Sequence, residues 1–386
     1  DTAAITSSTL ARPLHRALRH ARGARTRSGR GLEQQFDEHW LGVFGSRWPA
    51  LRGALAAPTE HVAWLSPFAP SHEPLGAGTR VRHSSGCDVF VRPDRNAAAL
   101  PPPTAGALSS HYLLDGASPL PALRLAPRRG HRVIDCCAAP GGKTLVLAAQ
   151  LFGGTSAAAE SAPSGELAPS YESAPPAAAS TLLIANDRSP ARRGRLRRVL
   201  EGYLPAHLLC DAHGLPQRLA SAGTPFEGVA VTGVDAADWG RGGSWSSLRF
   251  DRILLDAPCS SERHFLHDDG AAGDAVWSRA RMKRDASHQA AILRNAARLL
   301  APRGRLVYST CSLDPAQNDG AMRKLLGHKR HGAGLAVGDA LGGALAEPAL
   351  AALLNGAERT AVGAMMLPDA SRFGPLYWAV IERSEE

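Results

Sequence analysis

The stretch that decides the fold is RVIDCCAAPGGKTLVLAA, residues 132–149. Its first four residues, Arg132 to Asp135, form a short, mostly apolar run of the kind that makes a buried strand. A proline-glycine-glycine turn follows at residues 140–142, and the leucines, valine and alanines after Lys143 favour a helix. The order of strand, glycine-rich turn and helix predicts the start of a Rossmann-like α/β pattern.

Four more apolar strands are expected, at residues 181–185, 228–232, 252–255 and 305–308. Helical patterns lie between them, above all the leucines and alanines from residue 292 to residue 300. Fully apolar strands that alternate with helices indicate a parallel sheet covered on both faces. We therefore expect a Rossmann-like α/β fold with a mostly parallel sheet, preceded by a small, mainly helical N-terminal module. Ligands of such sheets bind at the carboxyl ends of the strands.

Changes in composition divide the chain into parts. Residues 1–32 are rich in arginine and almost free of acids, which is typical of an organellar transit peptide; a basic arm that contacts RNA is the alternative. Residues 33–105 form the expected N-terminal module, with one or two amphipathic helices between residues 33 and 68. The large domain spans residues 106–386. Residues 153–180 within it are dominated by alanine, serine and proline and should be a disordered insertion.

The charge balance favours a polyanionic partner. The chain has 44 Lys and Arg against 35 Asp and Glu, a formal net charge of +9 and a pI near 9.7, which favours nucleic acid over an acidic substrate. Two basic runs, Arg192–Arg198 and Arg279–Arg284, either contact phosphates or are ordinary solvated surface. No apolar run is long enough to span a membrane, so we expect no membrane partner.

The chain contains six cysteines without the spacing of metal ligands, so we expect no metal site. Two of them, Cys259 and Cys311, follow apolar strands at the ligand-binding edge of the expected sheet. Taken singly, each fits an inert core thiol. Together, and with Asp256 three residues before one of them, they favour thiolate chemistry. A depressed thiol pKa is then required, and Lys143 is a basic group that would provide it.

The ring that suits such a thiolate is cytosine. Carbon 5 of cytosine is a poor nucleophile until a thiolate adds to carbon 6 and turns the ring into an enamine. An acid must also share its proton with ring nitrogen 3, or accept a hydrogen bond from the exocyclic amine, and Asp256 is placed for this. Cys259 and Cys311 are both placed to reach the ring, and the residues alone do not decide which one attacks.

The glycine turn favours an adenosyl cofactor over a nucleoside triphosphate or a dinucleotide. A phosphate loop needs a glycine at the position of Cys137, and no GxGxxG pattern occurs at this turn. The zwitterionic tail of S-adenosylmethionine fits a tight turn at a helix N-terminus. Asp187 follows the second strand, where a carboxylate can accept both ribose hydroxyls, and Asp235 follows the third, placed for an adenine amine. Each is otherwise a capping or turn aspartate.

The chain resembles the NOL/NOP/Sun (Sun/Fmu-type) family of RNA cytosine-5 methyltransferases in three motifs that stand in family order: CAAPGGK at residues 137–143, DAPC at residues 256–259 and TCS at residues 310–312. The resemblance covers residues 106–325 and implies a class I methyltransferase domain with S-adenosylmethionine as cofactor. It implies that Cys311 is the nucleophile and that Cys259 assists release of the methylated RNA. The implied cofactor contacts are Cys137, Ala138, Ala139, Pro140, Gly141, Gly142, Lys143, Asp187, Arg192, Asp235 and Asp256.

Further segments are similar to the mitochondrial ribosomal-RNA branch of that family: residues 36–55, 186–192, 263–267 and 317–318. This similarity implies a small-subunit rRNA substrate, a mitochondrial location, with a plastid or other organelle as the alternative, and a helical-repeat protein as a possible partner. The chain departs from the family in the insertion at residues 153–180 and in LYW at residues 376–378, where the family has Gly-Phe-Phe.

Other functions stay open at this point. The chain is alternatively an RNA-binding ribosome assembly factor whose methylation is dispensable, although the intact Asp256, Cys259 and Cys311 argue against a dead enzyme. The same chemistry on tRNA is a further alternative. DNA cytosine methylation fits less well, because those enzymes attack through the cysteine that follows proline and lack the second cysteine.

Overall fold

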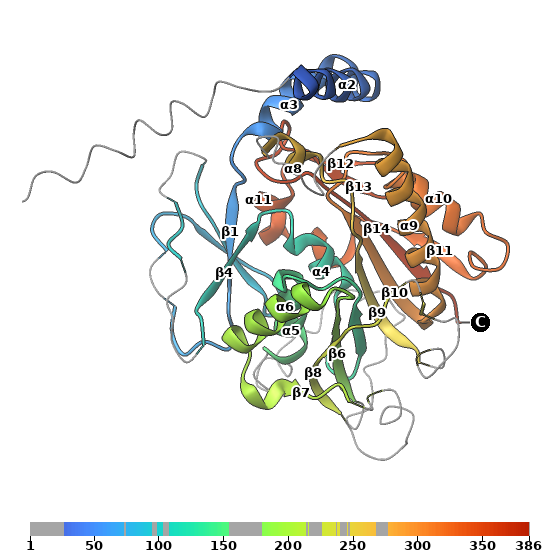
Figure 1. Cartoon of the computed structure of the whole chain (residues 1–386). Coiled ribbons are helices and arrows are strands. Elements are labelled where there is room, and N and C mark those ends of the chain that lie inside the picture. The colour runs from blue at the N-terminus through green and yellow to red at the C-terminus, as the bar shows by residue number, and fades with distance from the viewer. Residues whose placement is uncertain are drawn as a thin grey trace, which may run out of the picture.

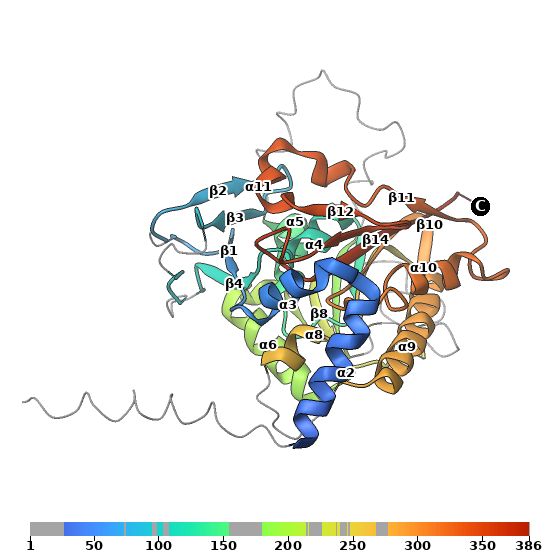
Figure 2. The ribbon, with the colours of Figure 1, turned by 90° about the horizontal axis from the view of Figure 1, so that it is seen from above.

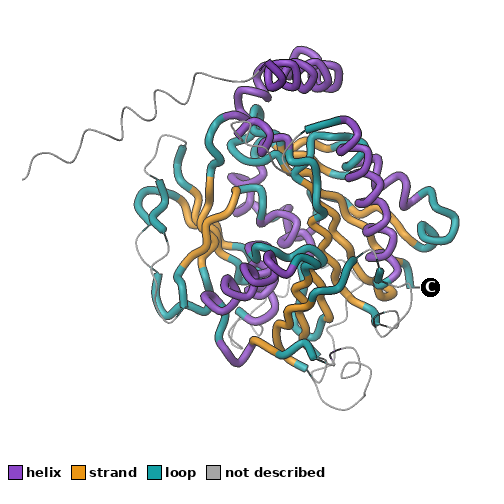
Figure 3. The backbone as a smooth tube through the Cα atoms, in the orientation of Figure 1, coloured by secondary structure: helices purple, strands orange, loops and turns teal. Residues whose placement is uncertain are grey.

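Two sheets carry the fold (Figures 1 and 3). One is a four-stranded antiparallel sheet near the N-terminus, and the other is a ten-stranded mixed sheet. The computed structural model describes residues 27–72, 75–94, 99–102, 108–153, 180–213, 215, 226–236, 238–239, 245, 248–267 and 277–385.

The elements of the large sheet and its helices have these bounds: β5 (Arg132–Asp135), α5 (Gly142–Phe152), β6 (Thr181–Asn186), α6 (Pro190–Tyr203), β7 (Leu209–Cys210), β8 (Glu227–Thr232), β9 (Phe250–Asp256), α8 (Glu262–His267), α9 (Arg279–Arg298), β10 (Leu300–Thr310), α10 (Asp319–Leu326), β11 (Leu335–Gly338), α11 (Ala351–Leu354), β12 (Ala357–Arg359), β13 (Ala364–Met366) and β14 (Leu376–Arg383). The elements before it are α2 (Arg27–Phe44), α3 (Trp48–Ala56), β1 (His61–Leu65), β2 (Thr79–Arg82), β3 (Asp88–Val91), β4 (His111–Asp115) and α4 (Pro119–Leu125).

The strand order of the large sheet is β12-β13-β14-β10-β9-β5-β6-β8-β7, and β11 pairs with the later residues of β14. The run from β10 to β7 is parallel, whereas β14, β13, β12 and β11 are antiparallel to their neighbours. The five predicted apolar strands are therefore confirmed as β5, β6, β8, β9 and β10. Since β9 and β10 are neighbours, with Asp256 paired to Ser309, the segments that carry Cys259 and Cys311 leave the sheet side by side.

Helices cover both faces of the large sheet (Figures 1 and 2). On one face, Val133 and Leu254 belong to the core that includes residues of α4, α5 and α6. On the other face, Ile134 and Ile253 belong to a second core, shared with α9 and α10. Neighbouring residues alternate between the two cores because side chains of a strand point to opposite faces. Both faces are covered, which explains why each parallel strand is apolar throughout.

The N-terminal part differs from its prediction in one element. Helices α2 and α3 are confirmed, but the prediction of helix up to residue 68 is wrong at His61–Leu65, which is strand β1. β1 pairs with β3 on one side and β4 on the other, in a sheet of order β2-β3-β1-β4. Four successive residues, Val62 to Leu65, are buried, so the sequence shows no alternation that would distinguish a strand from a helix.

Aromatic contacts join the N-terminal helices to the rest of the protein. The ring of Phe36 in α2 lies 4.5 Å from Phe265 in α8 and 5.4 Å from Trp277, between ring centroids. Strand β4, which follows the expected boundary at residue 105, completes the four-stranded sheet, and that boundary stays a prediction. The leader up to residue 26 and residues 154–179 of the expected insertion lie outside the described residues.

Neither a membrane span nor a metal cluster is found within the ranges that the structure describes. No helix there is long and apolar enough to cross a membrane. No group of three or more His, Cys, Asp or Glu side chains there is arranged to hold a metal ion.

Candidate active site

A cavity lies beside the glycine turn between β5 and α5, and we name it the turn cavity. It has a volume of about 230 Å³, and its lining includes Tyr112, Asp115, Asp135, Pro140, Lys143 and Asp256. Gly141 has a φ of +128°, which disfavours any residue with a side chain. A Cβ atom on Gly142 would lie 3.0 Å from the ring of Tyr112. Glycine is therefore required at both positions of the turn, which lines this cavity at the start of α5.

A second cavity of about 230 Å³, the aspartate cavity, follows the ends of β6 and β8. Cys137, Asp187, Arg192 and Asp235 are among the residues that line it. Asp187 is buried; its Oδ1 accepts a hydrogen bond from the backbone N–H of Ser189 at 3.0 Å, and its Oδ2 lies 3.3 Å from Nε of Arg192. The carboxylate of Asp235 lies 3.3 Å from Nη1 of Arg188.

These residues fit an adenosyl cofactor. The Oδ2 atom of Asp187 is buried and accepts no hydrogen bond from the described residues; Nε of Arg192 lies 3.3 Å away as an ion-pair partner, so the oxygen can still accept a hydrogen bond from a ligand. A ribose hydroxyl is a donor of the right kind for this position. Because Cys137 lines the aspartate cavity while Pro140 and Lys143 line the turn cavity, the predicted loop runs along both.

A third cavity of about 250 Å³, the cysteine cavity, opens beside Cys311. Its lining also includes Thr59, Ser261, Arg263, His264 and Leu376, which come from parts of the chain far apart in sequence. Cys259 is not among its lining residues. Asp115, Ser118, Lys143 and Asp256 line both the turn cavity and the cysteine cavity. A ligand in the turn cavity and a ligand in the cysteine cavity would therefore contact the same four residues.

The structure brings the two predicted cysteines into contact. Cys259 and Cys311 are free thiols, and their Sγ atoms lie 2.9 Å apart. The hydrogen bond with Cys259 is the largest cause that lowers the pKa of Cys311; a hydrogen bond with Ser261 adds to it, and burial opposes it. The same contact, together with burial, raises the pKa of Cys259 well above its ordinary value. These opposite shifts favour Cys311 as the sulfur that ionises and Cys259 as the thiol that donates the hydrogen bond to it.

Lys143 bonds directly to Asp256, and its charge also interacts with Cys311, as predicted for a basic group near the thiol. Its Nζ atom donates a hydrogen bond of 2.7 Å to Oδ2 of Asp256, while Oδ1 of Asp256 accepts from the hydroxyl of Ser309 at 2.7 Å. Burial lowers the pKa of Lys143, but the charge of Asp256 and this hydrogen bond raise it more, so the amine stays charged. The cation is thus used to hold Asp256, and the main cause of the lowered pKa of Cys311 is Cys259.

A second buried carboxyl group lies in the turn cavity. Burial raises the pKa of Asp135 to about 7, and the hydroxyl of Thr144 donates to its Oδ2 at 2.7 Å. In the sequence, Asp135 stands out only as the end of a strand. Burial of an acid at that position depends on the helices that cover the sheet, so the sequence carries no separate signal for it.

Buried polar side chains that the sequence analysis missed hold the two cysteine loops. Glu262 accepts hydrogen bonds from the backbone N–H of Leu313 at 2.8 Å and from the hydroxyl of Ser312 at 3.4 Å. Asn318 accepts from the hydroxyl of Thr310 at 2.6 Å and donates to the carbonyl of Ser312 at 2.9 Å. Both neighbours of Cys311 are therefore fixed by Asn318, and the loop after it by Glu262.

The loop of Cys259 is fixed in a similar way. Nε2 of Gln289 donates to the carbonyl of Pro258 at 2.7 Å and to Oε1 of Gln317 at 2.9 Å. Gln317 in turn accepts from the backbone N–H of Ser260 at 3.2 Å and donates to the Ser260 hydroxyl at 2.8 Å. Residues 317–318 are quoted above only for their family likeness, and Gln289 and Glu262 carry no signal in the sequence.

The arginines in the first turn of the basic helix α6 donate hydrogen bonds to nearby backbone carbonyls. Nη2 of Arg192 donates to the carbonyl of Ala139 at 2.7 Å, and Nη1 of Arg193 donates to the carbonyls of Asp187 and Arg188 at 2.9 and 2.7 Å. These bonds hold α6 against the glycine turn. Arg195 and Arg198 are exposed.

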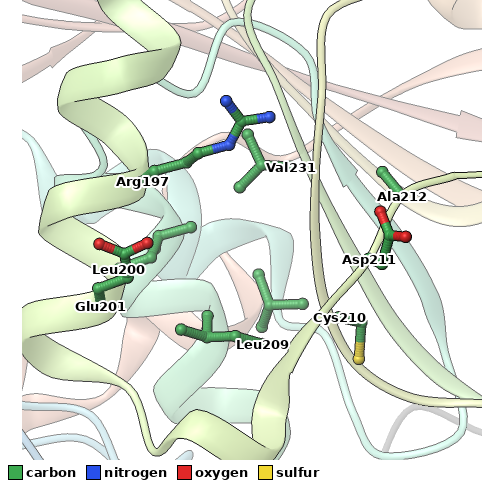
Figure 4. Close-up of a pocket in the computed structure, with 9 residues that line it drawn as sticks. Arg197, Leu200, Glu201, Leu209, Cys210, Asp211, Ala212 and Val231 are labelled. Atoms are coloured by element: carbon green, nitrogen blue, oxygen red, sulfur yellow. The ribbon is translucent and has the colours of Figure 1, made fainter.

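A further cavity of about 230 Å³ lies away from Cys259 and Cys311, between α6 and strands β7 and β8, and Cys210 is among its lining residues (Figure 4). Arg197 and Glu201 of α6 and Asp211 beyond β7 stand around it. No residue that the sequence predicts as catalytic or cofactor-binding lines it, so it is separate from the site.

The parallel sheet, covered on both faces and with cavities at the carboxyl ends of its strands, has the architecture of a class I methyltransferase. A family model described as "16S rRNA methyltransferase RsmB/F" matches residues 215–342. The 5-cytosine rRNA methyltransferase NSUN4 of Mus musculus is 30% identical over 322 residues, which cover 74% of this chain and 71% of the relative.

The mitochondrial tRNA (cytosine(34)-C(5))-methyltransferase of Mus musculus is 27% identical over 307 residues, 76% of this chain and 74% of the relative. A solved methyltransferase homologue from Pyrococcus horikoshii has the same fold, with a TM-score of 0.57 at 20% identity over 97% of this chain and 100% of that one. The chain belongs to the Sun-type RsmB/F family of RNA cytosine-5 methyltransferases, and its cofactor is S-adenosylmethionine.

Proposed function

We propose that this chain methylates carbon 5 of cytosine in small-subunit ribosomal RNA, through a covalent adduct with Cys311. The observation that carries the proposal is the 2.9 Å contact between the sulfur atoms of Cys259 and Cys311, at a cavity that Asp256 also lines. A thiolate beside an acceptor for the ring edge is what addition to cytosine requires.

The cofactor-binding roles follow from the two cavities beside the glycine turn. Residues 137–143 would hold the tail of S-adenosylmethionine, Asp187 its ribose and Asp235 its adenine. Arg192 would hold the Asp187 carboxylate in place, since its Nε lies 3.3 Å from the carboxylate. When bound, the cofactor supplies the methyl group as an electrophile.

The chain's own residues perform the remaining chemistry. The Cys311 thiolate adds to carbon 6 of the ring, and Cys311 is the cysteine that lines the cysteine cavity. Asp256, held by Lys143 and Ser309, accepts a hydrogen bond from the exocyclic amine or shares a proton with nitrogen 3. Cys259 keeps its proton and donates it toward the Cys311 sulfur as the adduct breaks, which is a role in release of the methylated RNA.

RNA binding is supported by exposed basic residues on two helices beside the aspartate cavity. Arg192 of α6 and His288 of α9 both line that cavity. On the same helices Arg195, Arg198, Lys283 and Arg284 are exposed, and exposed arginines and lysines bind phosphates. A cytosine inside a helix cannot reach Cys311, so the base is flipped out of its stack into the cysteine cavity.

The finer assignments rest on the relatives. We infer an rRNA substrate and a mitochondrial location, because NSUN4 relatives carry the name 5-cytosine rRNA methyltransferase and another relative is a mitochondrial tRNA enzyme. A helical-repeat protein partner is proposed only on the similarity to the mitochondrial ribosomal-RNA branch. We also retain residues 106–386 as the methyltransferase domain, with residues 33–105 as the N-terminal module.

The test is methylation of RNA by three versions of the protein. Cys311→Ala should abolish methyl transfer, whereas Cys259→Ala should accumulate a covalent protein–RNA adduct that resists denaturation. Bisulfite sequencing of mitochondrial and cytosolic RNA, with and without the protein, identifies the target and separates rRNA from tRNA. A fully active Cys311→Ala protein rules out the proposed mechanism. Rescue of ribosome assembly by Cys311→Ala without methylation would instead support the assembly-factor function.

A further inference from the structure

The proposed function leaves one chemical step without a residue. After methyl transfer, carbon 5 of the ring carries both the new methyl group and its original hydrogen. That proton must leave before the double bond between carbons 5 and 6 reforms and the Cys311 sulfur is expelled. General bases positioned for such a step contribute about 10²–10⁴-fold to the rate.

The place of that base is restricted by the cavities. Carbon 6 is bonded to Cys311 in the cysteine cavity, and the methyl group arrives from the cofactor side, so carbon 5 lies where the two sides meet. Four residues line both the turn cavity and the cysteine cavity: Asp115, Ser118, Lys143 and Asp256. The base is therefore expected among these four or at the sulfur pair.

Three of the other candidates for the base already have another role in the site. Lys143 is a charged donor to Asp256, and a protonated amine accepts nothing. Both oxygens of Asp256 accept hydrogen bonds, from Lys143 and Ser309, and its role is at the ring edge. Cys259 holds its proton beside Cys311, so it suits the departing sulfur better than the hydrogen of carbon 5. Ser118 has a neutral hydroxyl, which is a weak base.

Asp115 has the geometry of a fixed acceptor. It is the last residue of β4, and its Oδ1 atom accepts hydrogen bonds from the backbone N–H groups of Ala117 at 2.8 Å and Gly374 at 3.2 Å. The two amides lie far apart in sequence, and both bind the same oxygen of the carboxyl group. Burial is the largest cause that raises its pKa above the ordinary value, and a carboxylate with a raised pKa is a stronger base.

We propose that Asp115 is the catalytic base that removes the proton from carbon 5 of the methylated adduct, an inference that rests on the proposed function. The carbon–hydrogen bond breaks and its proton passes to the Asp115 carboxylate. The electron pair forms the double bond between carbons 5 and 6. The bond from carbon 6 to sulfur breaks, and its electron pair returns to Cys311 as the thiolate, which again accepts a hydrogen bond from Cys259. Asp115 then loses the proton to solvent.

The experiment uses Asp115→Asn in the full chain, because asparagine keeps an oxygen for the Ala117 and Gly374 amides. The substrate RNA carries tritium on carbon 5 of cytosine, and the cofactor carries a labelled methyl group. First-turnover methyl incorporation reports addition and transfer, and tritium release reports proton removal. We expect methyl incorporation within about threefold of wild type, tritium release reduced about 100-fold or more, and a methylated covalent adduct on denaturing gels.

The matched control is Asp319→Asn, which changes another hydrogen-bonded aspartate that lines none of the three cavities; it should leave the ratio of tritium release to methyl incorporation unchanged. Equal loss of both labels in Asp115→Asn, or unchanged tritium release, overturns the proposal. Should Asp115→Asn not fold, Asp115→Ser offers the amides a hydroxyl acceptor and is assayed with the same two labels. Absence of methylation by the wild-type protein would instead contradict the proposed function itself.

Discussion

Two pairs of cysteines stand at the carboxyl edge of the same sheet, and they differ in what surrounds the sulfur. Cys136 and Cys137 follow β5, and burial, followed by nearby negative charges, raises the pKa of each well above its ordinary value. Cys259 and Cys311 follow β9 and β10, and each provides the other's nearest sulfur, 2.9 Å away. Only in the second pair does one thiol lower the pKa of the other.

The comparison shows that a reactive thiolate here needs a donor more than it needs a cation. Lys143 lies on the turn that begins with Cys137, yet that thiol keeps a raised pKa, because the lysine is bound to Asp256. Burial protonates a cysteine unless something donates a hydrogen bond to the thiolate. The thiol of Cys259 does this for Cys311, and no such bond is found for Cys136 or Cys137 among the described residues.

The largest expected effect is in alkylation by iodoacetamide, followed by mass spectrometry of each cysteine between about pH 6 and pH 9. Because its pKa is lowered, Cys311 should ionise at lower pH and react about 100-fold or more faster than Cys136 near neutral pH. Cys259→Ala removes the donor, so the labelling curve of Cys311 should move to higher pH. Equal labelling of Cys136 and Cys311, or a labelling curve of Cys311 that does not move in Cys259→Ala, would contradict the claim that Cys259 lowers the pKa of Cys311.

A smaller effect is expected from the buried carboxylate that fixes the loop after Cys311. Glu262→Ala leaves the buried backbone N–H of Leu313 without its acceptor, which costs about 1–3 kcal/mol, while the hydroxyl of Ser312 keeps its contact with Ser260. Displacement of the loop should also slow methyl transfer by roughly 10–100-fold, since small misplacements at a reacting group are expensive.

Glu262→Gln is the matched control, because its amide oxygen still accepts from Leu313. We expect it to retain most of the stability and rate, as measured by thermal unfolding and single-turnover methylation. If both variants methylate at the wild-type rate, the position of Cys311 does not depend on this carboxylate.

The positions of Cys259 and Cys311 could be predicted from the sequence, but the polar side chains that hold their loops could not. Cys259 and Cys311 each follow an apolar run, and apolar runs in a βα pattern place their last residues at one edge. The polar side chains that hold them, Glu262 and Gln289, lie on helices α8 and α9. Their function depends on which loop packs against the helix, and helical spacing says nothing about this.

One prediction was incomplete and another was wrong, for related physical reasons. Lys143 was predicted to act on a thiol; its charge does interact with Cys311, but its hydrogen bond goes to the carboxylate of Asp256, which is a stronger acceptor than a thiol. His61–Leu65 was predicted as helix, since a central strand with both faces covered shows no alternation in sequence. In both cases the answer depends on a partner far away in the chain.

The smallest effect is expected at the pair formed by Cys136 and Cys137. Cys136 is 1% exposed and packs in the core that contains Ile134, Ile253 and Leu255. Cys136→Ala removes only a sulfur atom from this core, so the free energy of unfolding should fall by about 1 kcal/mol. Methyl transfer should be unchanged, because a thiol with a raised pKa takes no part in nucleophilic chemistry. Chemical denaturation and single-turnover methylation measure the two quantities on the same sample, and a variant of wild-type stability with reduced methyl transfer would show that this cysteine also serves the reaction.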